Sequence, residues 1–167
     1  MLHKSFVGEH KHSGVLFFPF YNQSLRALII ESIDVMTNVE KLWSYAVGII
    51  SGLNHLHTYG FVHSDIKPAN VLIDKGKVII IDFGAAIKIG DPIIEYTASY
   101  SLGLHNYPAS PHLDWVCTAV TLYVCHTSNF HIISIDELIV DSKRLNNKIG
   151  DLIVRLCLEK EALIEDL

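Results

Sequence analysis

The chain has 167 residues, half of them hydrophobic and 19% charged, so it is long and apolar enough to bury the core of one domain. Its formal charge of −5, with no block of Lys and Arg, argues against a basic face for phosphates, and no nucleic-acid partner is expected. The three cysteines lack Cys-x-x-Cys spacing, so neither a disulfide framework nor a zinc site is expected. The sequence contains no signal-peptide core and no apolar run of about eighteen residues. We therefore expect an intracellular protein without a membrane span.

The first predicted elements are a short strand and a short helix. Residues 15–18 form an apolar run of strand length, followed by Pro19 and a polar stretch. Ser24 is suited to cap a helix over residues 25–31, because a serine hydroxyl can accept a hydrogen bond from the first turn. The expected order is therefore strand, linker and helix.

A long helix is predicted next, and it has the strongest pattern in the chain. It begins after Thr37 or Asn38, either of which can be the N-cap, and it ends before Gly60. Apolar residues recur at helical spacing along one face: Leu42, Ala46, Ile49, Ile50, Leu53 and Leu56. His55 and His57, two positions apart on this helix, are not expected to face each other.

Two short β-branched runs, at residues 71–73 and 78–81, predict a β-hairpin with its turn at residues 74–77. Asn70 immediately precedes the first run and Asp82 immediately follows the second. Antiparallel pairing brings these two side chains to the same open end of the hairpin. An amide oxygen and a carboxylate suit Mg²⁺, which keeps its other positions for water and phosphate oxygens.

The rest of the chain predicts a loop and two helices. About thirty residues after Gly84 show no convincing periodicity and are expected to form an ordered loop. Residues 113–124 and 149–158 are apolar and of helical length, with polar connections between them. Cys117 and Cys125 are expected to pack as small apolar residues in the helical core.

Asp65 and Lys67 reach the open end of the hairpin from the loop before it. A carboxylate there can orient a hydroxyl and accept its proton, and a cation can neutralise charge on a transferring phosphoryl group. The alternative is a polar turn between helix and strand, with Asp82 in a strand-ending turn. The combination of these residues with Asn70 favours a catalytic site.

Four segments resemble parts of protein kinases. Residues 63–70 (HSDIKPAN) resemble the kinase catalytic loop, and residues 82–84 (DFG) resemble the metal-binding segment at the expected separation across a hairpin. Residues 15–25 are similar to the hinge strand and the connection that touches adenine. Asp114-Trp115 is similar to the start of the kinase helix whose aspartate holds the catalytic loop, although Asp114 could also be simply an N-cap. The resemblance covers roughly residues 15–160.

The resemblance implies an α+β, protein kinase-like fold. Most of the chain, residues 23–167, would be the helical large lobe, truncated at its C-terminal end and with the short β-hairpin at the catalytic site. Residues 1–22 would contain the hinge and a remnant of the small-lobe sheet.

The resemblance also implies a serine/threonine protein kinase that uses ATP and Mg²⁺ and acts on protein substrates, since a lysine lies two positions after Asp65. Asp65 would be the catalytic base and Lys67 the phosphate-facing cation. Thr97 would lie near both, and His63 and Phe83 would pack to align the site. The nucleotide-binding residues would be Phe18, Phe20, Asn70, Leu72 and Asp82, of which Asn70 and Asp82 would hold the metal.

Departures from the kinase pattern leave two functions open. Ser64 replaces the arginine of His-Arg-Asp, so an activation-loop phosphate would lack its usual guanidinium partner. Residues 102–104 (LGL) stand where kinases carry Ala-Pro-Glu, and no Gly-rich loop or strand lysine precedes Val15. The first expectation is a serine/threonine kinase whose small lobe is reduced or supplied by another chain. The alternative is a non-catalytic kinase-like lobe, similar to viral kinase mimics, that binds another kinase or its substrate.

Overall fold

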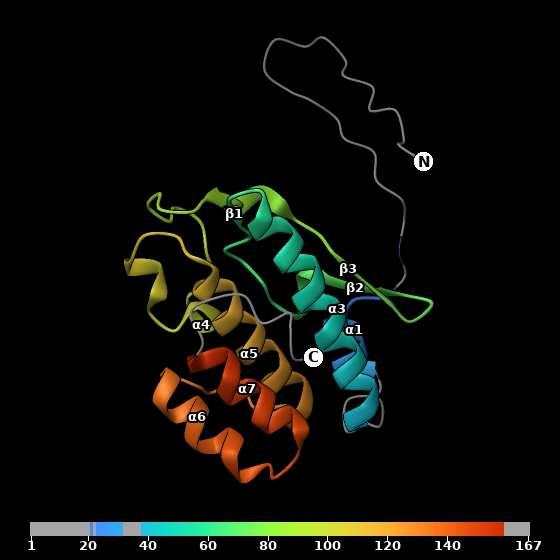
Figure 1. Cartoon of the computed structure of the whole chain (residues 1–167). Helices are drawn as coiled ribbons and strands as arrows, with labels where there is room; N and C mark the ends of the chain where they lie inside the picture. The colour runs from blue at the N-terminus through green and yellow to red at the C-terminus, as the bar shows by residue number, and fades with distance from the viewer. Residues whose placement is uncertain (1–20, 22, 32–37, 159–167) are drawn as a thin grey trace.

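The computed structural model describes residues 21, 23–31 and 38–158, which are mostly helical and contain two small sheets (Figure 1). The strand predicted at residues 15–18 and most of the expected small-lobe remnant lie outside the described residues. The elements run in the order α1 (Leu25–Glu31), α3 (Val39–Thr58), β1 (Phe61–Val62), η1 (Pro68–Asn70), β2 (Val71–Asp74), β3 (Lys77–Ile80), η2 (Phe83–Ala85), β4 (Ile87–Lys88), α4 (Ala98–Ser101), η3 (Leu104–Asn106), α5 (Pro111–Thr127), α6 (Ile135–Arg144) and α7 (Lys148–Leu158).

The first two helices begin at the predicted capping residues. Ser24 Oγ accepts a hydrogen bond from the backbone N of Ala27 at 3.1 Å, and Asn38 Oδ1 accepts one from Lys41 N at 3.0 Å. Both bonds satisfy backbone donors that have no partner inside the helix. Helix α3 ends at Thr58, and Gly60 follows with a φ of +78°. The prediction of these two helices is confirmed.

The predicted hairpin is formed by β2 and β3, which pair in antiparallel register from Val71 opposite Ile80 to Asp74 opposite Lys77. Lys75 and Gly76 make the turn with φ values of +50° and +80°. Positive φ at both turn residues matches the right-handed twist of the flanking strands. Strand β3 ends one residue earlier than predicted, at Ile80 rather than Ile81.

The hairpin packs directly against α3 because two glycines allow a close approach. A Cβ atom at Gly48 would lie 2.7 Å from Val78 Cβ, and one at Gly52 would lie 2.9 Å from Ile80 Cδ1. Any larger residue would push β3 away from the helix. The position of the hairpin is therefore set by the backbone of α3.

The segment after Gly84, expected to be a loop, contains a short strand. Strand β4 pairs antiparallel with β1, with Phe61 opposite Lys88 and Val62 opposite Ile87. A backbone hydrogen bond from Ile89 N to Gly60 O at 2.9 Å extends the pairing, and Gly90 N donates to Ala109 O at 2.8 Å. A further bond runs from Ala109 N to Asp91 O at 2.9 Å. The loop is thus fixed at both ends by backbone bonds.

Helix α5 is the centre of the core. Every residue from Leu113 to Cys125 is buried, and α3 and α7 pack against it. A helix that is apolar on all sides is stable only when other elements surround it. Cys117, Cys125 and Cys157 are buried free thiols, as expected for small apolar residues, and burial raises the pKa of Cys125 and Cys157 to about 12. None of the described helices has the length and apolarity needed to span a membrane.

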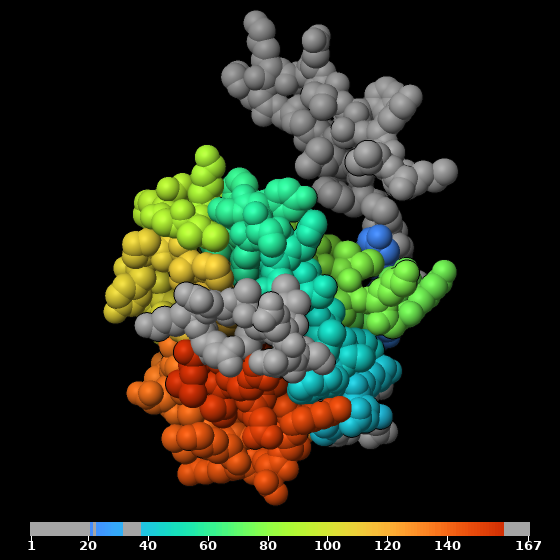
Figure 2. Space-filling model, in the orientation of Figure 1, coloured from blue at the N-terminus to red at the C-terminus, as the bar shows by residue number. Residues whose placement is uncertain are grey.

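Helix α6 corrects the prediction of a polar connection between two helices. Ser134 Oγ accepts a hydrogen bond from Glu137 N at 3.1 Å, and Glu137 Oε2 accepts one from Ile133 N at 2.9 Å. This Ser-x-x-Glu arrangement is a capping signal present in the sequence. The helix buries Leu138 and packs against α7. Figure 2 shows α6 and α7 (orange to red) at the lower end of the molecule and the β2–β3 hairpin (green) at its right edge.

Candidate active site

One buried carboxylate anchors the loop between β1 and β2. Asp114 Oδ2 accepts a hydrogen bond from His63 N at 2.8 Å, and Asp114 Oδ1 accepts one from Ser64 N at 2.9 Å. His57 Nε2, on α3, lies 2.8 Å from the same Oδ2 atom. The Asp114 side chain is fully buried. Charge-assisted hydrogen bonds of this kind are shorter and stronger than neutral ones, so they fix the loop against α3 and α5.

Asp114 is not the N-cap of its helix. Helix α5 begins at Pro111, after Ser110, so Asp114 lies within the first turn. The N-cap alternative is therefore wrong, and the expectation that this aspartate holds the loop by hydrogen bonds is confirmed. The contact from His57 was not predicted, because nothing local in the sequence relates residues so far apart.

Ser64 has an unusual backbone conformation at this anchor. Its φ is +69°, in the left-handed region, and its Oγ is buried with no hydrogen-bond partner among the described residues. A strained non-glycine residue costs roughly 1–3 kcal/mol and persists only where its surroundings hold it. The bond from Ser64 N to Asp114 is one such constraint.

Asp65 lies at the centre of a polar cluster. Its Oδ2 accepts a hydrogen bond from Lys67 Nζ at 2.6 Å, and its Oδ1 accepts one from Thr97 Oγ1 at 2.5 Å. Lys67 Nζ also donates to Thr97 Oγ1 at 3.0 Å. Asn70 Nδ2 lies 3.2 Å from Asp65 Oδ2. The prediction that Thr97 lies near Asp65 and Lys67 is confirmed.

The surroundings of Asp65 favour its ionised form. Burial raises the pKa of this carboxyl, but hydrogen bonds from Lys67 and Thr97, the charge of Lys67 and the bond from Asn70 outweigh burial, so the pKa is lowered. The stabilisation that this gives is present at neutral pH and is lost as the pH falls through the lowered pKa. Asp65 is therefore a carboxylate that can orient a hydroxyl group at neutral pH.

At the open end of the hairpin, Asn70 and Asp82 each carry a side-chain oxygen that can serve as a metal ligand. Ile81 N donates to Asn70 O at 3.0 Å, so the pairing continues one step past β3 and Asp82 follows directly. Asn70 Nδ2 also donates to Asp65 O at 2.8 Å. With its amide hydrogens directed at Asp65, Asn70 keeps Oδ1 for another partner. Asp82 is exposed, with a φ of +63°.

This donor set fits Mg²⁺ better than a transition metal. Among the described residues, no group of three or more His, Cys, Asp and Glu side chains is placed to hold a metal ion. A site here would consist of the Asp82 carboxylate and the Asn70 amide oxygen. Mg²⁺ is commonly bound by one or two protein oxygens, with water and phosphate oxygens completing its shell.

Phe83 and His63 contact each other beside this end of the hairpin. Their ring centroids are 5.0 Å apart, and His63 Nε2 lies 3.0 Å from Ile81 O. Phe83 is nevertheless 52% exposed. The expected nucleotide contact Leu72 lies on β2, bridged to Ser24, whereas Phe18 and Phe20 lie outside the described residues.

Known proteins share this sequence pattern. Residues 3–151 match the family model of the protein kinase domain. The chain is 30% identical over 158 residues to serine/threonine-protein kinase PSK1 of Saccharomyces cerevisiae, an alignment that covers 83% of this chain and 12% of that protein. It is 35% identical over 97 residues to the proto-oncogene serine/threonine-protein kinase mos of Sus scrofa, covering 52% of this chain and 28% of that protein. It is also 35% identical over 89 residues to serine/threonine-protein kinase Sgk1 of Xenopus tropicalis, covering 47% of this chain and 21% of that protein.

Proposed function

This chain belongs to the protein kinase family, and we propose that it transfers the γ-phosphoryl group of ATP to a serine or threonine hydroxyl of a protein substrate. The alignments span only 12% to 28% of the relatives' lengths, so the activity of those whole proteins does not pass automatically to this chain. The observation that carries the proposal is the hydrogen-bonded cluster of Asp65, Lys67, Asn70 and Thr97.

In the proposed reaction, Asp65 orients the attacking hydroxyl and accepts its proton. Its lowered pKa makes it a weak base, so it acts mainly by positioning until the hydroxyl becomes acidic in the transition state. Lys67, 2.6 Å from this carboxylate, would neutralise charge that develops on the transferring phosphoryl group. Thr97 holds both side chains in place through its hydroxyl.

Asn70 Oδ1 and the Asp82 carboxylate would hold Mg²⁺, which supplies positive charge against the phosphates of the nucleotide. Asn70 connects this site to the acceptor site, because its Nδ2 bonds to both the backbone and the side chain of Asp65. The position of the proposed metal ligand and that of the proposed base are therefore set together.

Replacing Asp82 by asparagine tests the metal assignment. The parent is expected to bind ADP more tightly when Mg²⁺ is present, and D82N is expected to lose this gain while its affinity without Mg²⁺ stays within about twofold. Asparagine keeps the shape of the side chain but removes its charge and replaces one oxygen by an amide nitrogen. Titration of labelled ADP with and without Mg²⁺ measures both quantities.

Asp74→Asn is the matched control, because it removes a carboxylate from the opposite end of the same hairpin. It should keep the full effect of Mg²⁺. An unchanged effect of Mg²⁺ in D82N would contradict the metal assignment. An assay of labelled-phosphate transfer from ATP to a generic protein substrate completes the test. Transfer by the parent and not by D82N is expected, whereas absence of transfer by both proteins contradicts the proposed function.

A second function is favoured by an exposed apolar groove between α3 and the hairpin. The groove has a volume of about 370 Å³, and Tyr59 and Phe83 on its border are 69% and 52% exposed. Its described lining residues are Gly48, Gly52, His55, Leu56, Tyr59, Val78, Ile80 and Phe83. Exposed aromatic side chains beside an apolar groove offer contact area to a second protein. It suits a kinase-like lobe that binds another kinase or a chain that supplies a small lobe.

Size-exclusion chromatography with light scattering separates the two functions. Self-association through the groove at high concentration would support the binding function, and Tyr59→Glu would then shift the protein back towards monomer. Val140→Glu, at an exposed apolar residue on α6, is the matched control and should leave the elution unchanged. A monomer at every concentration, together with phosphate transfer by the parent, contradicts the second function.

A further inference from the structure

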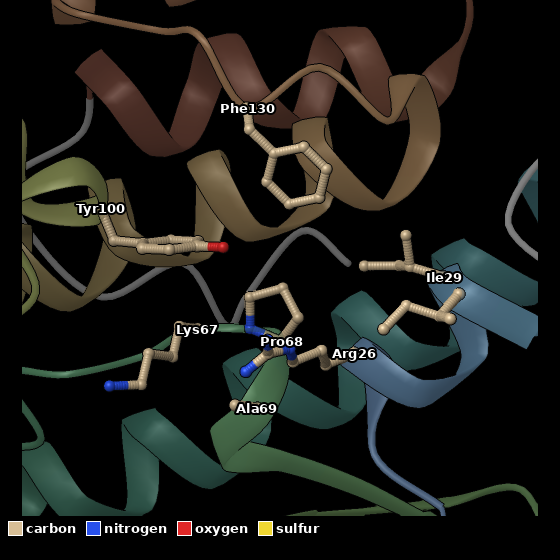
Figure 3. A pocket seen from close by; sticks show the side chains of 8 residues that line it. Arg26, Ile29, Lys67, Pro68, Ala69, Tyr100 and Phe130 are labelled. Atoms are coloured by element: carbon tan, nitrogen blue, oxygen red, sulfur yellow. The ribbon is translucent and has the colours of Figure 1, made fainter.

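A second pocket opens beside the Asp65 cluster and shares Lys67 with it. Its volume is about 450 Å³. Helix α1 contributes Arg26, Ile29 and Ile30, the loop before β2 contributes Lys67, Pro68 and Ala69, and Tyr100 and Phe130 complete the described lining. In Figure 3 the Tyr100 hydroxyl points into the space between Phe130, Pro68 and Ile29. A peptide whose hydroxyl reaches Asp65 would therefore place neighbouring side chains here.

The pocket combines apolar walls with positive charge. Its described lining residues include two cations, Arg26 and Lys67, and no Asp or Glu. The charge of Lys67 is already paired with Asp65 at 2.6 Å. Arg26 is exposed and forms no ion pair with a carboxylate among the described residues. Arg26 is therefore the cation that remains for a ligand.

The position of Arg26 does not serve the stability of its own helix. It is the second residue of α1, and the first turn of a helix favours anions over cations. The charge of Arg26 also affects the pKa of Tyr100, on the other side of the pocket. Burial raises the pKa of Tyr100 to about 12, and Arg26 opposes this rise. Tyr100 thus stays a neutral hydroxyl that can donate a hydrogen bond beside the guanidinium group.

We propose that this pocket selects substrate segments with an acidic side chain close to the acceptor serine or threonine, that Arg26 binds this carboxylate, and that Ile29 and Phe130 contact an adjacent apolar residue. The choice of a protein substrate rests on the proposed function. A guanidinium group suits the two oxygens of a carboxylate, and the apolar walls suit an adjacent apolar side chain. The net charge of −5 repels acidic peptides in general, so a preference for them must come from a local site.

Binding of acceptor-free peptides tests the proposal without requiring catalysis. Labelled peptides with alanine at the acceptor position, one apolar neighbour, and Glu, Gln or Lys within three residues are titrated by fluorescence anisotropy. The parent is expected to bind the Glu peptide at least about fivefold more tightly than the Lys peptide. Arg26 attracts the Glu side chain of the first peptide and repels the Lys side chain of the second, and both effects widen the difference in affinity. Arg26→Glu is expected to reverse this order, and Arg26→Gln to remove it.

Lys143→Glu is the matched control, since it makes the same charge change at an exposed position on α6. It should keep the parent's preference. Equal binding of the three peptides, no measurable binding, or a preference that survives in Arg26→Glu would each overturn the proposal. The serine versions of the peptides are then assayed for phosphate transfer. Lack of transfer with the binding order intact contradicts the proposed function alone, whereas transfer without a charge preference contradicts the inference alone.

Discussion

Replacement of Asp65 by asparagine is expected to lower phosphate transfer by about 10²- to 10⁴-fold, the usual contribution of a general base. Asparagine is nearly the same size but keeps only one oxygen, so only one of Thr97 and Lys67 retains its acceptor, and the group that accepts the proton is lost. The nucleotide is expected to bind with nearly the parent's affinity, because its metal ligands are unchanged. Labelled-phosphate assays and ADP titrations measure the two effects separately.

Asp136→Asn makes the same chemical change at an exposed position on α6, far along the chain from the cluster. It should leave both transfer and nucleotide affinity at the parent's values. Transfer by D65N at the parent rate would show that Asp65 is not the base. A large loss of ADP affinity in D65N would instead place Asp65 in nucleotide binding.

Replacement of Asp114 by alanine is expected to lower the free energy of unfolding by about 2–6 kcal/mol, because two buried backbone N–H groups lose their acceptor at about 1–3 kcal/mol each. The backbone N–H groups of His63 and Ser64 would remain buried without an acceptor, and the partly buried ring of His57 would lose its partner. Since small domains are stable by only about 5–15 kcal/mol, this loss is a large part of the total. Urea unfolding followed by circular dichroism measures it.

Asp114→Asn keeps one oxygen acceptor in the same place, and it is expected to be less damaging than Asp114→Ala. This variant keeps the test decisive if the alanine variant does not fold. Asp151→Ala, at an exposed position in the first turn of α7, is the control and should change stability by no more than about 0.5 kcal/mol. A loss below about 1 kcal/mol in Asp114→Ala would contradict the role of this carboxylate as the anchor of the loop.

Elements with a strong local signal were predictable from the sequence. Asn38 and Gly60 bracket α3, and the turn at Lys75 and Gly76 defines the hairpin. These features depend on residues a few positions apart. Helix α6 was missed although its Ser134 and Glu137 carry a capping signal, because only a few apolar residues support it.

Contacts between distant segments could not be derived from local pattern. Strands β1 and β4 have two residues each, too few for any alternation to be seen. The convergence of Asp65 and Thr97 and the loop contacts of Asp114 were expected only through the resemblance to kinases. The contact of His57 with Asp114 and the position of Arg26 beside Lys67 emerge only from the folded chain, because packing of α3 against α5 creates the first and packing of α1 against η1 creates the second.

The backbone pairing that closes the loop after Gly84 also determines how this loop unfolds. Its ends are joined to Gly60 and to each other through Ile89, Gly90 and Ala109. The ends cannot detach without breaking these backbone bonds or separating β1 from β4, whereas the residues between them can open with the ends still joined. Thr97 lies in this middle part, so its hydrogen bonds with Asp65 and Lys67 can break while the pairing at the ends stays intact.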